Sequence, residues 1–153
     1  MADLDQFTTP VEFRITGGMK TIDENREVMK VCYAFNQAID KEGQMTGIVR
    51  GGTITVRVKA LNNGNVHLVE WMLTSNMHKD GEIVFVETKD RRPMRTVEFK
   101  EAYCVDYRDV WEDKTGSADD LGHYEEFTLS CREITVKSTG SNPGVAKFSN
   151  NWK

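Results

Sequence analysis

The sequence predicts a mainly β fold, either an antiparallel β-barrel or two packed sheets, with one short α-helix on its flank. Three observations support this prediction. Apolar and polar residues alternate with a period of two along most of the chain, clusters of Gly, Asn and Asp separate the alternating segments, and a single segment has apolar residues at helical spacing. We expect one domain over 1–153, with its core over about 10–137 and a tail over 138–153.

Seven segments are predicted as strands, and the first three alternate most clearly. The first begins at Val11 and stops at Gly17-Gly18, and a polar loop or short turn is expected over 20–26. The second covers 28–37, and one of its faces carries Met29, Val31, Tyr33 and Phe35. The third follows Gly51-Gly52 over 53–59, and its inward residues are Ile54, Val56 and Val58.

One helix is predicted over 66–74, because its apolar residues recur at a spacing of three and four. Asn63 or Asn65 is expected to cap its first turn. The apolar residues of this segment are Leu68, Val69, Met72 and Leu73, with Trp71 beside them. A helix this short needs tertiary packing, so we expect it to close one flank of the β structure.

The second half of the chain returns to strands. Asp80-Gly81 is expected to be a turn into a strand over 82–87. After a polar loop over 88–93, this strand forms a hairpin with a strand over 94–100, and a separate long strand follows over 102–111.

A polar loop over 112–122 precedes the last predicted strand, which runs from His123 or Tyr124 to Lys137. Its inward residues change from odd to even positions, which predicts a bulge near Arg132-Glu133. The tail is rich in Gly, Ser and Asn, and we expect neighbouring molecules to order part of it.

Charge and hydropathy argue against two classes of partner. A formal net charge of −4 argues against nucleic acid and against an anionic membrane surface. The longest apolar runs, such as 83–86, are far shorter than the ~20 residues that cross a bilayer, so no membrane insertion is expected. The N-terminus lacks the basic and apolar regions of a signal peptide, which predicts synthesis in the cytoplasm.

The sequence holds no common motif for nucleophilic catalysis, phosphate binding or zinc binding, so we expect neither enzyme activity nor a cofactor. His67 and Glu70 lie three residues apart on the predicted helix, but a metal site needs three or four ligands. The three cysteines lie among apolar residues, and we expect all of them to be buried and reduced: Cys32, Cys104 and Cys131.

The segment 38–50 is long for a connection between two well-formed strands, which usually takes about two to five residues. It has no apolar period, and it contains Gly43 and Gly47. Loops of this kind are usually functional or mobile. Its apolar residues Ile39 and Met45 are candidates for burial against a neighbouring molecule.

Several stretches resemble one known family. Residues 33–43 (YAFNQAIDKEG) and 49–54 (VRGGTI) resemble the second strand, extended loop and third strand of Bacteroidetes-type Hcp (TssD) proteins. Residues 69–73 (VEWML) and 79–85 (KDGEIVF) resemble the helix and next strand of that family. Further matching stretches are 97–105 (VEFKEAYCV), 129–134 (LSCREI) and Asn150-Asn151-Trp152.

The resemblance implies a tube subunit of the type VI secretion system. Copies would form homohexameric rings that stack into an inner tube, which a contractile sheath propels outward with a VgrG-like spike at its tip and effectors as cargo. The tube would assemble in the cytoplasm and leave it without a cleavable signal peptide. The extended loop would contact neighbouring subunits and rings through Ile39, Asp40, Lys41, Glu42, Gly43, Gln44, Met45, Thr46 and Gly47.

Two other functions stay open. A tail-tube protein of a phage or of another contractile particle has the same architecture as a secretion tube. A monomeric barrel that binds a small ligand would have an apolar interior cavity, whereas a tube subunit would have a filled core and would assemble. A hydrolase that uses a cysteine or a histidine is disfavoured by the missing motifs.

Overall fold

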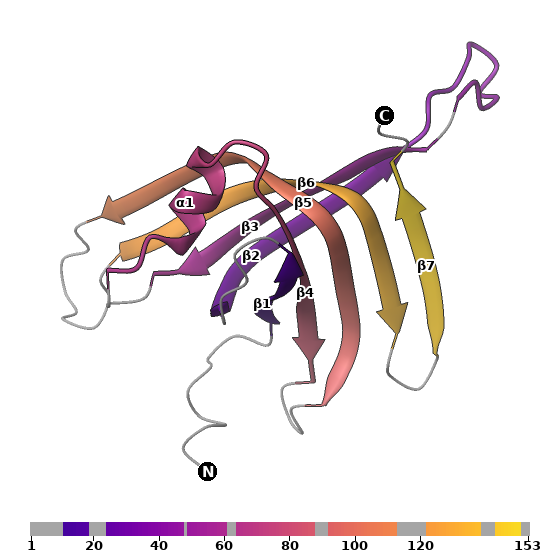
Figure 1. Ribbon diagram of the computed structural model, residues 1–153. Helices are drawn as coiled ribbons and strands as arrows, with labels where there is room; N and C mark the ends of the chain where they lie inside the picture. Colours follow the sequence, from indigo (N-terminus) through magenta and orange to yellow (C-terminus); the bar gives the residue numbers. More distant parts are fainter. Residues whose placement is uncertain are drawn as a thin grey trace.

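The computed structural model describes residues 11–18, 24–47, 49–60, 64–87, 92–112, 122–138 and 143–150. These residues form seven strands and one helix (Figure 1). In chain order the elements are β1 (Val11–Gly18), β2 (Glu24–Asn36), β3 (Arg50–Lys59), α1 (His67–Leu73), β4 (His78–Val86), β5 (Pro93–Glu112), β6 (Gly122–Ser138) and β7 (Gly144–Ser149). The mainly β fold class is confirmed.

All strand pairs are antiparallel, in the order β3-β2-β1-β4-β5-β6-β7. The sheet closes on itself, because β3 also pairs with β6, from Thr53 opposite Ser130 to Lys59 opposite Tyr124. Of the two predicted architectures, a barrel or two packed sheets, the closed sheet corresponds to the barrel. Closure also removes two of the unpaired edges that an open sheet would expose.

Strand β6 has two partners on the same edge. It pairs with β3 up to Ser130, and its last residues, from Glu133 to Ser138, pair with β7. Gly52 permits this exchange, because it has a φ of 87° and a Cβ there would lie 2.5 Å from Nδ2 of Asn150. Asn150 occupies the space, and its side-chain amide donates to the carbonyl oxygen of Cys131 at 2.8 Å. Part of the predicted tail is therefore ordered within the same chain.

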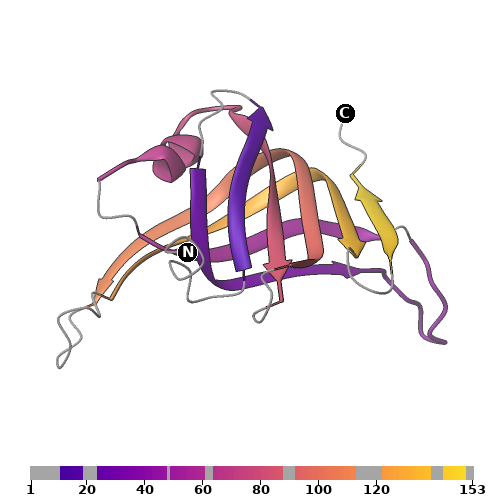
Figure 2. The same cartoon turned by 90° about the horizontal axis from the view of Figure 1, so that it is seen from below.

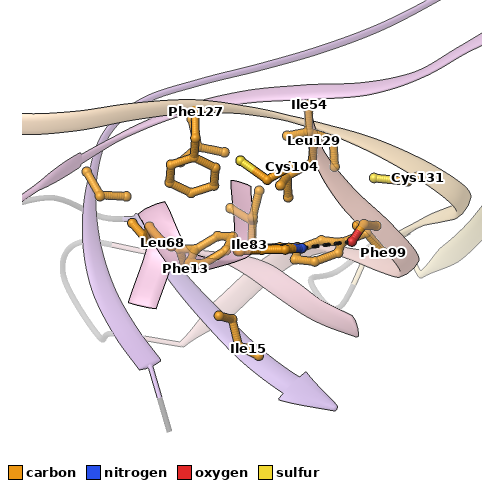
Figure 3. Packing of buried hydrophobic residues seen from close by; sticks show 14 of the residues in the cluster. Phe13, Ile15, Ile54, Leu68, Ile83, Phe99, Cys104, Phe127, Leu129 and Cys131 are labelled. Atoms are coloured by element: carbon orange, nitrogen blue, oxygen red, sulfur yellow. Dashed lines mark hydrogen bonds between the residues drawn. The ribbon is translucent and has the colours of Figure 1, made fainter. Parts of the chain in front are cut away.

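The interior is filled by side chains that the alternation predicted. Ile54, Val56 and Val58 are fully buried on β3. The ring of Phe13 contacts two other rings, with centroids 5.8 Å from Phe99 and 5.3 Å from Phe127 (Figure 3). Such stacked and edge-to-face pairs are the preferred aromatic geometries.

The helix α1 closes one flank of the sheet, as predicted. Leu68 and Trp71 are buried, and the indole Nε1 of Trp71 donates to the carbonyl oxygen of Ala102 on β5 at 3.2 Å. The predicted cap by Asn65 is wrong, because the N-cap position is Val66 and no side chain caps the helix. Asn65 lies just before it and accepts a hydrogen bond from the backbone N–H of His67 at 3.3 Å, and Asn63 lies outside the described residues. Leu73 faces solvent instead of the core.

Strand β2 begins earlier than predicted, and Glu24–Arg26 belong to it rather than to a loop. A register shift against β3 between Val28 and Lys30 changes which side chains face inward. Val28 is buried in consequence, and Met29, which was assigned to one face with Val31 and Tyr33, is 45% exposed.

The predicted turn at Asp80-Gly81 is wrong, since both residues lie inside β4. A Cβ on Gly81 would lie 2.5 Å from the ring of Phe99, so glycine lets that ring pass over the strand. Asp80 accepts a hydrogen bond from the backbone N–H of Glu101 at 2.8 Å. The dipeptide thus marks a close approach of two strands.

The strands predicted over 94–100 and 102–111 are one continuous strand, β5. The chain keeps its direction at Glu101, but this residue has a φ of 48°. The inward side chains therefore change from odd to even positions, and Phe99 and Ala102 are both buried. Two predicted strands are thus one strand, β5, and the structure adds β7, which was not predicted. The number of strands is therefore still seven among the described residues.

The predicted change of face on β6 is also present, since Cys131 and Ile134 are both buried. The predicted bulge near Arg132-Glu133 is wrong. Lys100 pairs with Glu133 and Ala102 with Cys131, so the register between β5 and β6 does not change there. The register shift between β5 and β6 lies further along, between Cys104 and Asp106.

Candidate assembly surface

The segment between β2 and β3 projects away from the sheet as an arm, which we define as residues 37–47 (Figures 1 and 2). The arm is not the irregular loop that the sequence suggested. Ile39 and Met45 pair as an isolated antiparallel bridge, which makes the segment a small hairpin. The predicted site residues 40–44 lie between the two bridged residues, at the tip of the arm, and Thr46 and Gly47 lie at its base.

Hydrogen bonds within the arm fix its shape. The carboxylate Oδ1 of Asp40 accepts from the backbone N–H groups of Glu42 at 3.0 Å and Gln44 at 2.8 Å. At the base, the N–H of Thr46 donates to the carbonyl oxygen of Ala38 at 2.9 Å. An aspartate that bonds backbone groups ahead of it stabilises a turn. Asp40 therefore acts as a shaping residue of the arm.

The apolar residues of the arm face solvent. Ile39 is 64% exposed and Met45 is 68% exposed, and as a bridged pair they lie side by side. Covering a side chain of this size stabilises a complex by about 1.5–3 kcal/mol. The arm therefore presents a preformed apolar contact, and Lys41 and Glu42 next to it are exposed charges.

A groove lies at the base of the arm, between the β2–β3 end of the sheet and the β6–β7 hairpin. Its volume is about 480 Å³, and the rings of Phe35 and Phe148 meet there with centroids 5.1 Å apart. Its lining residues are Phe35, Val49, Ile134, Val136, Ala146, Lys147, Phe148 and Ser149. Sequence reasoning missed this groove because it left β7 out of the sheet.

A buried ion pair joins four strands near the other end of the sheet. The guanidinium of Arg26 lies 2.8 Å from the carboxylate of Glu125, and it also donates to the carbonyl oxygen of Lys59 at 3.0 Å. The hydroxyl of Tyr107 donates to the same carboxylate. Burial, and then this hydrogen bond to Glu125, raises the pKa of Tyr107 well above its ordinary value. The group is closed from solvent, which indicates a structural role.

Two of the three cysteines are buried as predicted, and burial raises the pKa of both the Cys104 and the Cys131 thiol to about 12. The expectation for Cys32 is wrong, because its side chain is exposed. Val31 and Tyr33 pack against the core, so the residue between them on the strand points to the opposite face. All three thiols are free.

We expect native Cys32 to react with a thiol reagent at least about a hundredfold faster than the other two cysteines, since the thiolate is the reactive form and burial suppresses it. The measurement is the time course of labelling at neutral pH, with peptides identified by mass spectrometry. The variant Cys32→Ser should lose the fast phase. Fast labelling of Cys104 or Cys131 in the folded protein would contradict this assignment.

Among the residues that the structure describes, no group of three or more His, Cys, Asp and Glu side chains is placed to hold a metal ion. Within the same residues, no helix has the length and the apolar character to cross a membrane.

A family model for the hemolysin coregulated protein Hcp (TssD) matches residues 10–153. The chain belongs to this Hcp family. Its members are structural tube proteins of the type VI secretion system, which associate as rings and tubes and are secreted by that system. The resemblance seen in the sequence is thereby confirmed.

Solved structures show the same fold. Hcp1 from Flavobacterium johnsoniae has a TM-score of 0.71 and 26% identity, over 92% of this chain and 98% of that one. Hcp1 from Escherichia coli EAEC 042, solved as a double mutant, has a TM-score of 0.72 and 14% identity, over 93% and 99%. The secreted protein Hcp3 from Pseudomonas aeruginosa has a TM-score of 0.62 and 17% identity, over 92% and 99%. No curated protein matches the sequence significantly.

Proposed function

We propose that this chain forms homohexameric rings that stack into the inner tube of a type VI secretion system. The observation that carries the proposal is the family match over 10–153 together with the exposed, preformed arm. The chain serves as a structural subunit and not as an enzyme. Its partners are further copies of itself, the contractile sheath, a VgrG-like spike at the tip and the effectors that the tube carries.

The filled interior supports this function over a small-ligand barrel. The rings of Phe13, Phe99 and Phe127 and the indole of Trp71 occupy the space that such a ligand would need. The groove of about 480 Å³ is lined in part by exposed side chains such as Phe35 and Lys147, so a neighbouring molecule can reach it. The protein assembles in the cytoplasm and is then secreted by the type VI system.

The arm is the ring-stacking element in this proposal. Ile39 and Met45 supply apolar area, and the charges of Lys41 and Glu42 select the register of the contact. The hydrogen bonds of Asp40 keep the arm in one shape before contact, which lowers the entropy lost on association. Gly43 and Gln44 at the tip and Thr46 and Gly47 at the base complete the surface.

Electron microscopy of the purified protein tests the function. We expect rings with a central hole, and in analytical ultracentrifugation a species about six times the mass of one subunit. A family of self-associating tube proteins requires this outcome, because one heterologous contact closes into a ring when its rotation divides a full turn. A strictly monomeric species at micromolar concentration and moderate salt would reject the proposal.

A further inference from the structure

One exposed aromatic side chain lies far from the arm. Trp111 is next to last in β5 and is 68% exposed. Its ring stacks on that of His123 across the β5–β6 pair, with centroids 3.5 Å apart and an angle of 18° between the planes. The Nε2 of His123 lies 2.6 Å from Oδ1 of Asp109. A large apolar ring is thus presented to solvent on a rigid support.

This support matters for binding. A side chain that a neighbour already holds in place loses little rotamer freedom when a partner covers it. Tryptophan is among the residues that most often dominate the energy of an interface. The free face of Trp111 therefore has the properties of an interface anchor.

The groove defined above supplies a pocket of matching chemistry. Its volume of about 480 Å³ lies within the range of roughly 300–1,000 Å³ typical of sites that take small organic molecules. Aromatic and aliphatic side chains line it, and Lys147 stands in its wall with its side chain 58% exposed. An indole fits these dimensions and this chemistry.

The groove and Trp111 lie at opposite ends of the sheet. In both views the end of β5 points away from β7 and from the arm (Figures 1 and 2). Complementary surfaces at the two ends of one subunit allow copies to associate head to tail. Such a series closes into a ring or continues as a filament.

We propose that Trp111 of one copy inserts into the groove of the next copy within the ring, an inference that rests on the proposed function. Charge supports the same partner. Asp109 lies two residues before Trp111 on the same face of β5, where it contacts His123, and it would meet Lys147 at the mouth of the groove. Lys147 pairs with Glu133 at 3.2 Å but keeps 58% of its side chain exposed, so Asp109 would join this pair as a second carboxylate. The occupant of the groove is therefore a second copy of this chain.

Two variants isolate the two halves of the contact. Trp111→Ala removes the anchor, and Ala146→Trp fills the groove from an exposed position on β7. Each variant alone should form rings only at concentrations at least roughly thirtyfold higher than the unaltered chain. An equimolar mixture should form dimers with one copy of each variant, since one intact contact remains. Native mass spectrometry and analytical ultracentrifugation measure these species.

Leu73→Ala is the matched control, because Leu73 is also an exposed apolar side chain, at 77%, but lies on α1. This variant should form rings at the same concentration as the unaltered chain. Circular dichroism verifies that all variants are folded. Rings that form from Trp111→Ala at the unaltered concentration would overturn the contact and leave the tube function intact.

Cross-linking identifies the occupant of the groove directly. In a Cys32→Ser background, Ala146→Cys is combined with either Trp111→Cys or Ile39→Cys and then oxidised, at a concentration above that at which Trp111→Ala forms rings. We expect a ladder of covalent oligomers with the 111–146 pair. A ladder with the 39–146 pair in place of the 111–146 pair would show that the arm fills the groove, and the proposal would be wrong. Absence of rings from the unaltered chain would instead reject the proposed function itself.

Discussion

Replacing Ile39 and Met45 together by Asp is expected to abolish tube formation and export while the subunit stays folded. The two side chains are exposed, so the substitutions remove no contact of the core. At a stacked-ring contact, however, two carboxylates would be buried without partners, which costs several kcal/mol for each contact. Circular dichroism reports the fold, electron microscopy the tubes, and immunoblots of culture supernatant the export.

The matched control is Leu73→Asp, which places the same charge on an exposed apolar position of α1. It should leave tubes and export unchanged. A deletion across 41–44 gives an independent test, because it shortens the arm without adding charge. Normal tubes and normal export from both the double variant and the deletion would show that the arm is not a stacking element.

Truncating the carboxylate of the buried ion pair should cause the largest loss of stability. Glu125→Ala leaves the guanidinium of Arg26, which is 1% exposed, without its counter-ion. Leaving one charge of a buried pair alone lowers the free energy of unfolding by about 3–5 kcal/mol. Urea denaturation followed by tryptophan fluorescence measures the change, since the buried Trp71 reports on the core.

The adjacent residue provides the control for that experiment. Glu126 pairs with Arg57 at 2.9 Å, but both side chains are partly exposed, so Glu126→Ala should cost about 0–1 kcal/mol. The double variant Arg26→Met, Glu125→Leu should recover most of the stability, because it removes both charges of the pair. Equal losses from Glu125→Ala and Glu126→Ala would contradict the structural role of the pair.

Local patterns predicted a large part of the fold. Alternation placed the core residues of β3, such as Ile54 and Val56, because side chains on a strand point to opposite faces in turn. Helical spacing placed α1 and its buried Trp71, because residues three and four apart lie on the same face of a helix. The arm was located as an unusual connection, and the resemblance to Hcp proteins supplied its expected role.

Contacts between distant segments decided what the sequence could not show. Arg26 is polar and was assigned to a loop, yet Glu125 gives it a partner inside the sheet. Gly81 looked like a turn, but the ring of Phe99 requires its missing side chain.

What the sequence by itself determined is the class of fold, the faces of the regular strands and the family, because each of these depends on the order of residues along the chain. Only the tertiary structure placed β7 against β6, shaped the arm through the bridge between Ile39 and Met45, and opened the groove beside Phe148. Each of these features depends on which segments meet, and a short window of sequence contains only one side of such a contact.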